Sequence, residues 1–276
     1  AHGPEAILPY SYAGTMGLVQ RNAGHAFFHA LGASRLDRTI CSPAKEAGWR
    51  VVMGGTPGPH PDEVAESDLV ILWGINAVAT NIHFLHGVRK AKENGATIWL
   101  IDTYQTLTSS AVDQVFMVRP GSDGALALGL MHLLVRDDLI DHDFLGSHVQ
   151  GFEELKEKIL QDFPPEKVSI LTGLPKETLE SVAKVYGTAR NPFIRLGSGL
   201  SRYANGAMTI RTIVCLPALV GAYGKRGGGC LAGTNTAAAF AMNTVLREDF
   251  MPKNTRIINM NRLGWALNEL NDPPVK

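Results

Sequence analysis

Short apolar runs alternate with amphipathic segments through the middle of the chain. Residues 68–73 and 96–101 are apolar enough to be strands buried on both faces. Between them, residues 81–94 carry apolar side chains at helical spacing, with basic residues near the end and a glycine after it. A strand, a helix and a second strand in this order predict a βαβ unit, whose strands are parallel.

The same alternation continues in both directions along the chain. A third strand is expected at 115–118 and a fourth at 192–196, and an earlier strand is expected at 6–10. Helices are expected at 19–31, 125–133, 142–148, 152–160, 165–171, 175–189 and 205–222, and the chain after residue 224 has no clear pattern. The sequence therefore predicts an α/β fold of parallel, doubly wound sheets with helices on both faces.

Composition and charge exclude several classes of protein. The chain has 276 residues, 45% of them apolar, which suits one large or two modest globular domains. Lys plus Arg and Asp plus Glu number 26 each, so no net field favours nucleic acid or an anionic membrane as a partner. The apolar stretches are shorter than the roughly 20 residues of a membrane span. The three cysteines are far apart in sequence, which favours a reducing, cytoplasmic location.

Polar residues and glycines follow the predicted strands at the points where they end. Gly74 and Asn76 follow the first strand, Asp102 and Thr103 the second, and a Pro-Gly-Ser-Asp sequence at 120–123 the third. Ligands of open parallel sheets bind at these carboxyl ends, so the pattern predicts a nucleotide site there. An aspartate after a strand is also often a helix cap or a turn residue. The Gly-rich dinucleotide fingerprint and the Walker A motif are both missing, which predicts a nucleotide held in another way.

Cys41 lies in Thr-Ile-Cys-Ser-Pro, ahead of the βαβ unit. From the residues alone it is either a buried structural cysteine or, through its thiolate, a nucleophile or soft metal ligand. Cys215 lies in an apolar helical segment and Cys230 follows three glycines. The nine histidines show no paired spacing typical of zinc ligands.

Several segments taken together resemble the molybdopterin oxidoreductases of the dimethyl sulfoxide reductase and formate dehydrogenase type. Each is weak alone, but their order and spacing make the set specific over nearly the whole chain. The segments are residues 11–17, 39–42, 67–76, 101–103, 118–129, 197–199, 227–229 and 258–264.

The resemblance implies a bis(molybdopterin guanine dinucleotide) cofactor that carries molybdenum, with tungsten as a possible substitute. It implies that Cys41 is the protein ligand of the metal and the catalytic residue. The residues implied to hold one guanine dinucleotide are Gly74, Asn76, Asp102, Thr103, Gly121 and Asp123. Those implied to lie near the second are Gly197, Ser198, Gly199 and Asn235.

The resemblance also implies how the chain is divided and what accompanies it. Residues 41–191 are expected to form a Rossmann-like domain that binds the guanine dinucleotide, and residues 1–40 and 192–276 a discontinuous α/β domain. The family's N-terminal segment with a 4Fe-4S cluster and its C-terminal closing domain have no counterpart here. The chain is therefore expected to be the central part of a longer molybdenum oxidoreductase, working with those regions and an electron-transfer partner in two-electron redox or oxygen-atom transfer.

Two other functions fit parts of the pattern. One is a non-catalytic relative of this fold, as in the iron–sulfur subunit of NADH dehydrogenases, although Cys41 and the strand-end polar residues argue against it. The other is an unrelated nucleotide-binding oxidoreductase or transferase of doubly wound fold. The sequence also departs from the family at 102–104, where Asp-Thr-Tyr replaces the usual Asp-Pro-Arg and removes an expected arginine contact to cofactor phosphates.

Overall fold

A computed structural model describes residues 2–12, 14, 17–233 and 240–276. The chain forms two compact units, one of residues 1–43 with 238–276 and one of residues 44–237. The strands are β1 (Arg35–Asp37), β2 (Leu69–Trp73), β3 (Thr97–Asp102), β4 (Gln114–Met117), β5 (Pro192–Leu196), β6 (Gly229–Leu231) and β7 (Ile257–Asn259). The α-helices are α1 (Leu18–Asn22), α2 (His25–Leu31), α3 (Ser42–Met53), α4 (Ala77–Thr80), α5 (Ile82–Glu93), α6 (Asp123–Arg136), α7 (His142–His148), α8 (Phe152–Asp162), α9 (Pro165–Thr172), α10 (Lys176–Thr188), α11 (Gly206–Leu219), α12 (Asn243–Leu246) and α13 (Leu263–Asn268).

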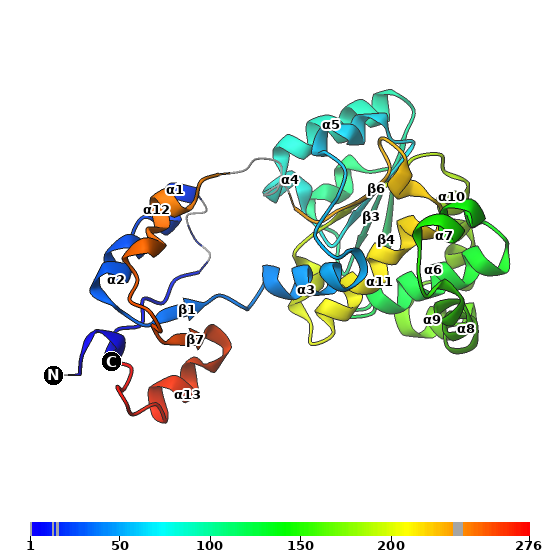
Figure 1. The fold of residues 1–276 in the computed structure, drawn as a ribbon. Coiled ribbons are helices and arrows are strands. Elements are labelled where there is room, and N and C mark those ends of the chain that lie inside the picture. Colours follow the sequence, from blue (N-terminus) through cyan, green and yellow to red (C-terminus); the bar gives the residue numbers. More distant parts are fainter. Residues whose placement is uncertain (1, 13, 15–16, 234–239) are drawn as a thin grey trace. The chain divides into compact units, whose positions relative to one another are not determined.

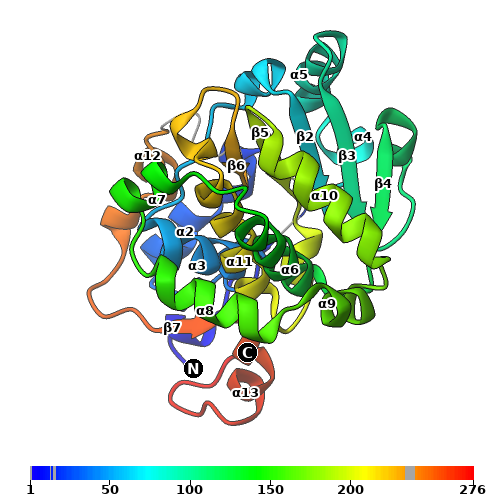
Figure 2. The ribbon, with the colours of Figure 1, turned by 90° about the vertical axis from the view of Figure 1, so that its right-hand side faces the viewer.

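The larger unit is built on a five-stranded parallel sheet (Figure 1). Its strands lie in the order β4-β3-β2-β5-β6, as Figure 2 shows. The chain starts this sheet at β2 in the centre, adds β3 and β4 on one side, and then adds β5 and β6 on the other. The strand order therefore reverses between β2 and β5. In open α/β sheets this switch point is where a crevice opens beyond the carboxyl ends of the strands.

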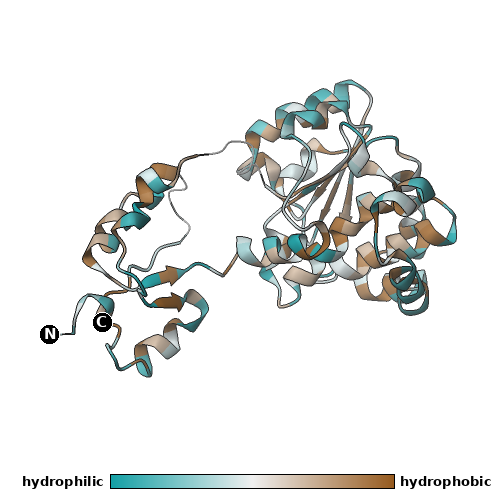
Figure 3. Ribbon diagram, viewed as in Figure 1, coloured by the Kyte–Doolittle hydropathy of each residue, from teal (hydrophilic) through white to brown (hydrophobic). Residues whose placement is uncertain are grey.

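Side chains alternate along β2 to build a separate core on each face of the sheet. Leu69, Ile71 and Trp73 join the larger core with residues of α6, α10 and α11. Val70 and Leu72 join the smaller core with residues of α5. Figure 2 shows α6 and α10 over the same face, and Figure 3 shows the strands as the most apolar part of the unit. Burial on both faces explains why these strands are continuous apolar runs.

The predicted α/β fold with parallel sheets flanked by helices is confirmed, but the division of the chain differs from the expected one. β5 pairs with β2 along its whole length, from Leu69 against Pro192 to Trp73 against Leu196. Residues 192–237 therefore belong to the same unit as the βαβ region, and not to the discontinuous one. The boundary at residue 192, which the resemblance implied, differs from this division because β5 continues the sheet of the βαβ region.

The discontinuous unit contains a two-stranded parallel sheet, β1 with β7. The strand expected at 6–10 is absent from the described residues there, where Pro4–Ala6 form a 3₁₀ turn. The helix expected at 19–31 is two helices, α1 and α2, separated at residues 23–24. Within the described residues, no helix is both long enough and apolar enough to cross a membrane.

Candidate functional site

A cavity of about 260 Å³ lies at the carboxyl ends of the central strands of the larger unit. Its walls come from the segments that follow β2, β3 and β5 and from the start of α6. The lining residues are Gly74, Asn76, Asp102, Thr103, Tyr104, Thr106, Asp123, Gly199, Leu200, Arg202 and Tyr203. We call it the switch-point pocket, because β2 and β5 are the strands between which the order reverses.

Close backbone contact between the ends of β2 and β5 forms one wall of this pocket. The Gly197 N–H donates a hydrogen bond of 2.7 Å to the carbonyl of Trp73. Gly74 has φ +61°, and a Cβ at Gly197 would lie 1.8 Å from the Gly74 carbonyl oxygen. Both positions therefore require glycine, the first for its left-handed backbone and the second for lack of space. Gly199, two residues after Gly197, lines the pocket.

Two carboxyl groups line the pocket, Asp102 at the end of β3 and Asp123 at the start of α6, and each accepts a hydrogen bond from the protein. The Thr103 N–H donates to Asp102 Oδ1 at 2.7 Å, and the Trp73 indole Nε1–H donates to Asp123 Oδ1 at 2.8 Å. Burial raises the pKa of both carboxyls, and the charge of Asp102 raises that of Asp123 further. Asp123 is only 3% exposed. The pocket therefore offers oriented acceptors whose negative charge is poorly solvated, which suits a ligand with several N–H or O–H donors.

Asn76 is oriented by a buried threonine from the segment that follows β3. The Thr108 hydroxyl donates to Asn76 Oδ1 at 2.9 Å and accepts the Val78 N–H at 3.1 Å. Thr108 has no exposed surface. This chain of hydrogen bonds ties the amide oxygen of Asn76 to the protein while the residue lines the pocket.

Some lining residues were not expected from the sequence. Arg202, in the 3₁₀ turn Gly199–Arg202, carries the only basic side chain among the described residues that line the pocket. Tyr104 and Tyr203 add two aromatic rings. Arg202 brings a guanidinium to the pocket from the segment that follows β5. The sequence held no local signal for this, because the position depends on β5 lying beside β2.

The structure brings six of the expected site residues together in one pocket: Gly74, Asn76, Asp102, Thr103, Asp123 and Gly199. Gly197 packs behind the wall and Ser198 is exposed outside it. Gly121 lies nearby, where its carbonyl accepts a hydrogen bond of 3.2 Å from Asn205 Nδ2. Asn235 lies outside the described residues. The roles of all these residues toward a ligand remain predictions.

Cys41 directly precedes α3 and is partly exposed, and its backbone N–H donates to the Tyr12 hydroxyl at 3.1 Å. Burial raises the pKa of Cys215 to about 11 and that of Cys230 still higher, so both remain protonated thiols at neutral pH. Within the described ranges, no group of three or more His, Cys, Asp or Glu side chains is placed to hold a metal ion.

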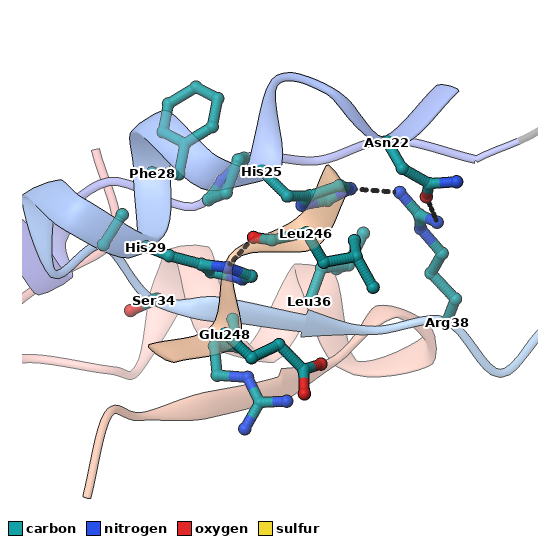
Figure 4. Close-up of a pocket in the computed structure, with 12 residues that line it drawn as sticks. Asn22, His25, Phe28, His29, Ser34, Leu36, Arg38, Leu246 and Glu248 are labelled. Atoms are coloured by element: carbon teal, nitrogen blue, oxygen red, sulfur yellow. Dashed lines mark hydrogen bonds between the residues drawn. The ribbon is translucent and has the colours of Figure 1, made fainter. Parts of the chain in front are cut away.

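The discontinuous unit has its own cavity of about 220 Å³, between α2, β1 and the end of α12 (Figure 4). Arg38 Nη2 lies 2.6 Å from His25 Nε2 and also donates to Ser11 Oγ at 2.6 Å. Burial, followed by the Arg38 charge, lowers the pKa of His25, which accordingly accepts this hydrogen bond as a neutral imidazole. Arg38 thereby anchors the segment next to Tyr12, which contacts Cys41.

Arg195 fixes the ends of β5 and β6, a role that its place in an apolar strand did not predict. Arg195 is 7% exposed, and its Nη1 donates to the carbonyls of Leu196, Leu231 and Ala232. Lys45 Nζ donates to the same Ala232 carbonyl at 2.9 Å. The two cations hold the backbone that leaves β6.

Comparison with known proteins agrees with this arrangement. The family model for molybdopterin oxidoreductases matches residues 16–270. The chain belongs to the molybdopterin oxidoreductase family. It is 42% identical to the probable oxidoreductase YoaE of Bacillus subtilis over 99% of this chain and 40% of that protein. It is 28% identical to formate dehydrogenase H of Escherichia coli over 81% of this chain and 32% of that one.

One solved structure has the same fold as this chain. Acetylene hydratase from Pelobacter acetylenicus matches with a TM-score of 0.69 at 21% identity, over 92% of this chain and 34% of that one. At this identity the likeness concerns the fold alone. The chain spans about 40% or less of the length of these three proteins.

Proposed function

We propose that the chain is the central cofactor-binding part of a molybdenum oxidoreductase that carries out two-electron redox or oxygen-atom transfer. In this proposal the cofactor is bis(molybdopterin guanine dinucleotide), with tungsten able to replace molybdenum. The observation that carries the proposal is the switch-point pocket, in which two carboxyls, an amide and a guanidinium from four segments converge.

The chemistry of this pocket fits the guanosine end of such a cofactor. Carboxylates accept the N–H donors of guanine and the hydroxyls of ribose, and Asp102 and Asp123 are both available for this. Arg202 supplies a cation for a phosphate, as a guanidinium does in many phosphate sites. The rings of Tyr104 and Tyr203 offer apolar surface to a base. In the proposal, Gly197, Ser198, Gly199 and Asn235 lie near the second dinucleotide, and Gly199 borders both.

Cys41 is the proposed protein ligand of the metal and the catalytic residue. Cys41 and Cys215 are both partly exposed, whereas Cys230 is buried. Burial raises the pKa of the Cys215 thiol to about 11, and the backbone of Cys41 is fixed by Tyr12. When bound, the cofactor supplies the redox chemistry of the metal. The chain's own residues bind it, orient its ends and limit access of water.

The proposal also includes an electron-transfer partner, further regions of the same protein and a cellular location. Among the relatives is an F420-dependent formate dehydrogenase subunit alpha of Methanocaldococcus jannaschii, 29% identical over 61% of this chain. By analogy, we propose a partner that exchanges electrons, a 4Fe-4S cluster in a preceding segment, a C-terminal closing region and a cytoplasmic location.

The test is metal and pterin analysis of the longer protein that contains this sequence. We expect about one molybdenum or tungsten per chain and a released pterin with guanine nucleotide by mass spectrometry. As a control, another member of the family is expressed under the same conditions. If that protein contains metal and pterin and the protein with this sequence contains neither, the result favours a non-catalytic relative.

A further inference from the structure

The indole of Trp73 is completely buried at the end of β2 and does not itself line the switch-point pocket. Its single polar atom donates to Oδ1 of Asp123, which does line the pocket. The pairing follows from the alternation along β2, which turns Trp73 to the face covered by α6, and Asp123 is the first residue of that helix. The hydrogen bond restricts which way the Asp123 carboxyl can turn.

We propose that Trp73 is a positioning residue that gives the pocket its preference for guanine over adenine, by holding the Asp123 carboxyl in a fixed orientation. This inference rests on the proposed nucleotide function. Guanine presents two adjacent N–H donors on the edge that a carboxylate can accept, whereas adenine presents one donor beside a ring nitrogen lone pair. A carboxylate in a fixed orientation therefore attracts both N–H groups of guanine, whereas it repels the ring nitrogen lone pair of adenine.

Removal of the indole N–H should change both the direction and the charge of Asp123. The hydrogen bond from Trp73 favours the ionised carboxyl, against the burial that raises its pKa. Without this bond, Asp123 holds its proton to a higher pH, and a protonated carboxyl can donate to the adenine ring nitrogen. The ionisable residues that face the same pocket are Asp102, Tyr104, Arg202 and Tyr203.

The experiment compares the 276-residue chain with its Trp73→Phe and Trp49→Phe variants by calorimetric titration with GMP and with AMP across pH. Trp49 is the matched control, because it is 1% exposed and its Nε1 has no hydrogen-bond partner in the described structure. We expect Trp73→Phe to weaken GMP binding about tenfold and to leave AMP binding unchanged or make it tighter. The pH below which GMP binding is lost should rise in this variant. Trp49→Phe should bind both nucleotides as the unmodified chain does.

Equal GMP affinity and an unchanged pH profile in Trp73→Phe would overturn the inference, as would equal losses in both tryptophan variants. If the unmodified chain binds GMP and only the positioning effect is missing, the proposed function stands and this inference is wrong. If the unmodified chain binds neither nucleotide, both are wrong. Should Trp73→Phe not fold, the Nε1–H NMR signal of Trp73 in the unmodified chain should titrate with the same midpoint as GMP binding, and a signal that does not titrate overturns the inference.

Discussion

The substitution Gly197→Ala tests whether the ends of β2 and β5 are as tightly joined as the structure shows. The new Cβ would lie 1.8 Å from the Gly74 carbonyl oxygen and 2.7 Å from the Ile75 Cα. Ordinary contact needs roughly 3.5 Å, so the two strand ends must separate by more than about 1 Å. The 2.7 Å hydrogen bond from the Gly197 N–H to Trp73 cannot survive that movement unchanged.

The expected cost combines two effects. Overpacking of a filled interior costs about 1–3 kcal/mol, and a weakened buried hydrogen bond adds about 1 kcal/mol. We therefore expect the free energy of unfolding to fall by about 2–4 kcal/mol, a large part of the roughly 5–15 kcal/mol of a typical domain. Because Gly199 and Gly74 line the pocket, GMP binding should weaken as well.

Urea denaturation with matched m-values gives the change in the free energy of unfolding. Gly146→Ala is the control, since Gly146 lies inside α7 with no atom within 4 Å of its Cβ position, and alanine favours a helix. That variant should be as stable as the unmodified chain or slightly more so. A loss below about 1 kcal/mol in Gly197→Ala would show that the two strand ends are not in close contact.

Three further variants test the site. Asp102→Ala should weaken the binding of GMP about tenfold or more in calorimetry, because an N–H donor of the base loses its buried acceptor. The control Asp62→Ala removes an exposed carboxylate and should leave the affinity for GMP unchanged. Asp123→Asn should raise the melting temperature at neutral pH, because burial raises the pKa of Asp123 in the folded state and its ionised form therefore lowers stability. This gain should vanish below about pH 4, where the carboxyl is protonated in both the folded and the unfolded state. A gain in melting temperature that persists below that pH would contradict the prediction. In the longer protein, Cys41→Ala should abolish turnover and reduce molybdenum content with little change in melting temperature, and retained turnover would refute the ligand role.

The central elements of the larger unit could be predicted because each is encoded locally. β2 is an unbroken apolar run that ends at Gly74, and β5 was expected at its observed bounds. The rule that ligands bind at the carboxyl ends of parallel strands predicts that Asp102 and Asp123 lie at the same edge of the sheet, and both line the switch-point pocket.

What could not be predicted depends on contacts between distant segments. Nothing in residues 192–196 says that they pair with β2, so the proximity of Gly199 and Arg202 to Asp102 was not foreseen. The pairing of β1 with β7 joins strands of three residues each, with Arg35 opposite Ile257, and such short strands show no periodicity. The hydrogen bond between Trp73 and Asp123 depends on how α6 packs on the sheet. The apolar pattern of one strand carries no information about that packing.

The most direct test of the account is an NMR titration of the isotope-labelled 276-residue chain with GMP. We expect the largest amide shift changes at Gly74, Asp102 and Gly199. The side-chain signals of Arg202 should also shift, because its guanidinium contacts the phosphate of GMP. Shifts confined to the cavity of His25 and Arg38 in the discontinuous unit, or no shifts at millimolar GMP, would contradict the claim that the switch-point pocket holds the guanosine end of the cofactor.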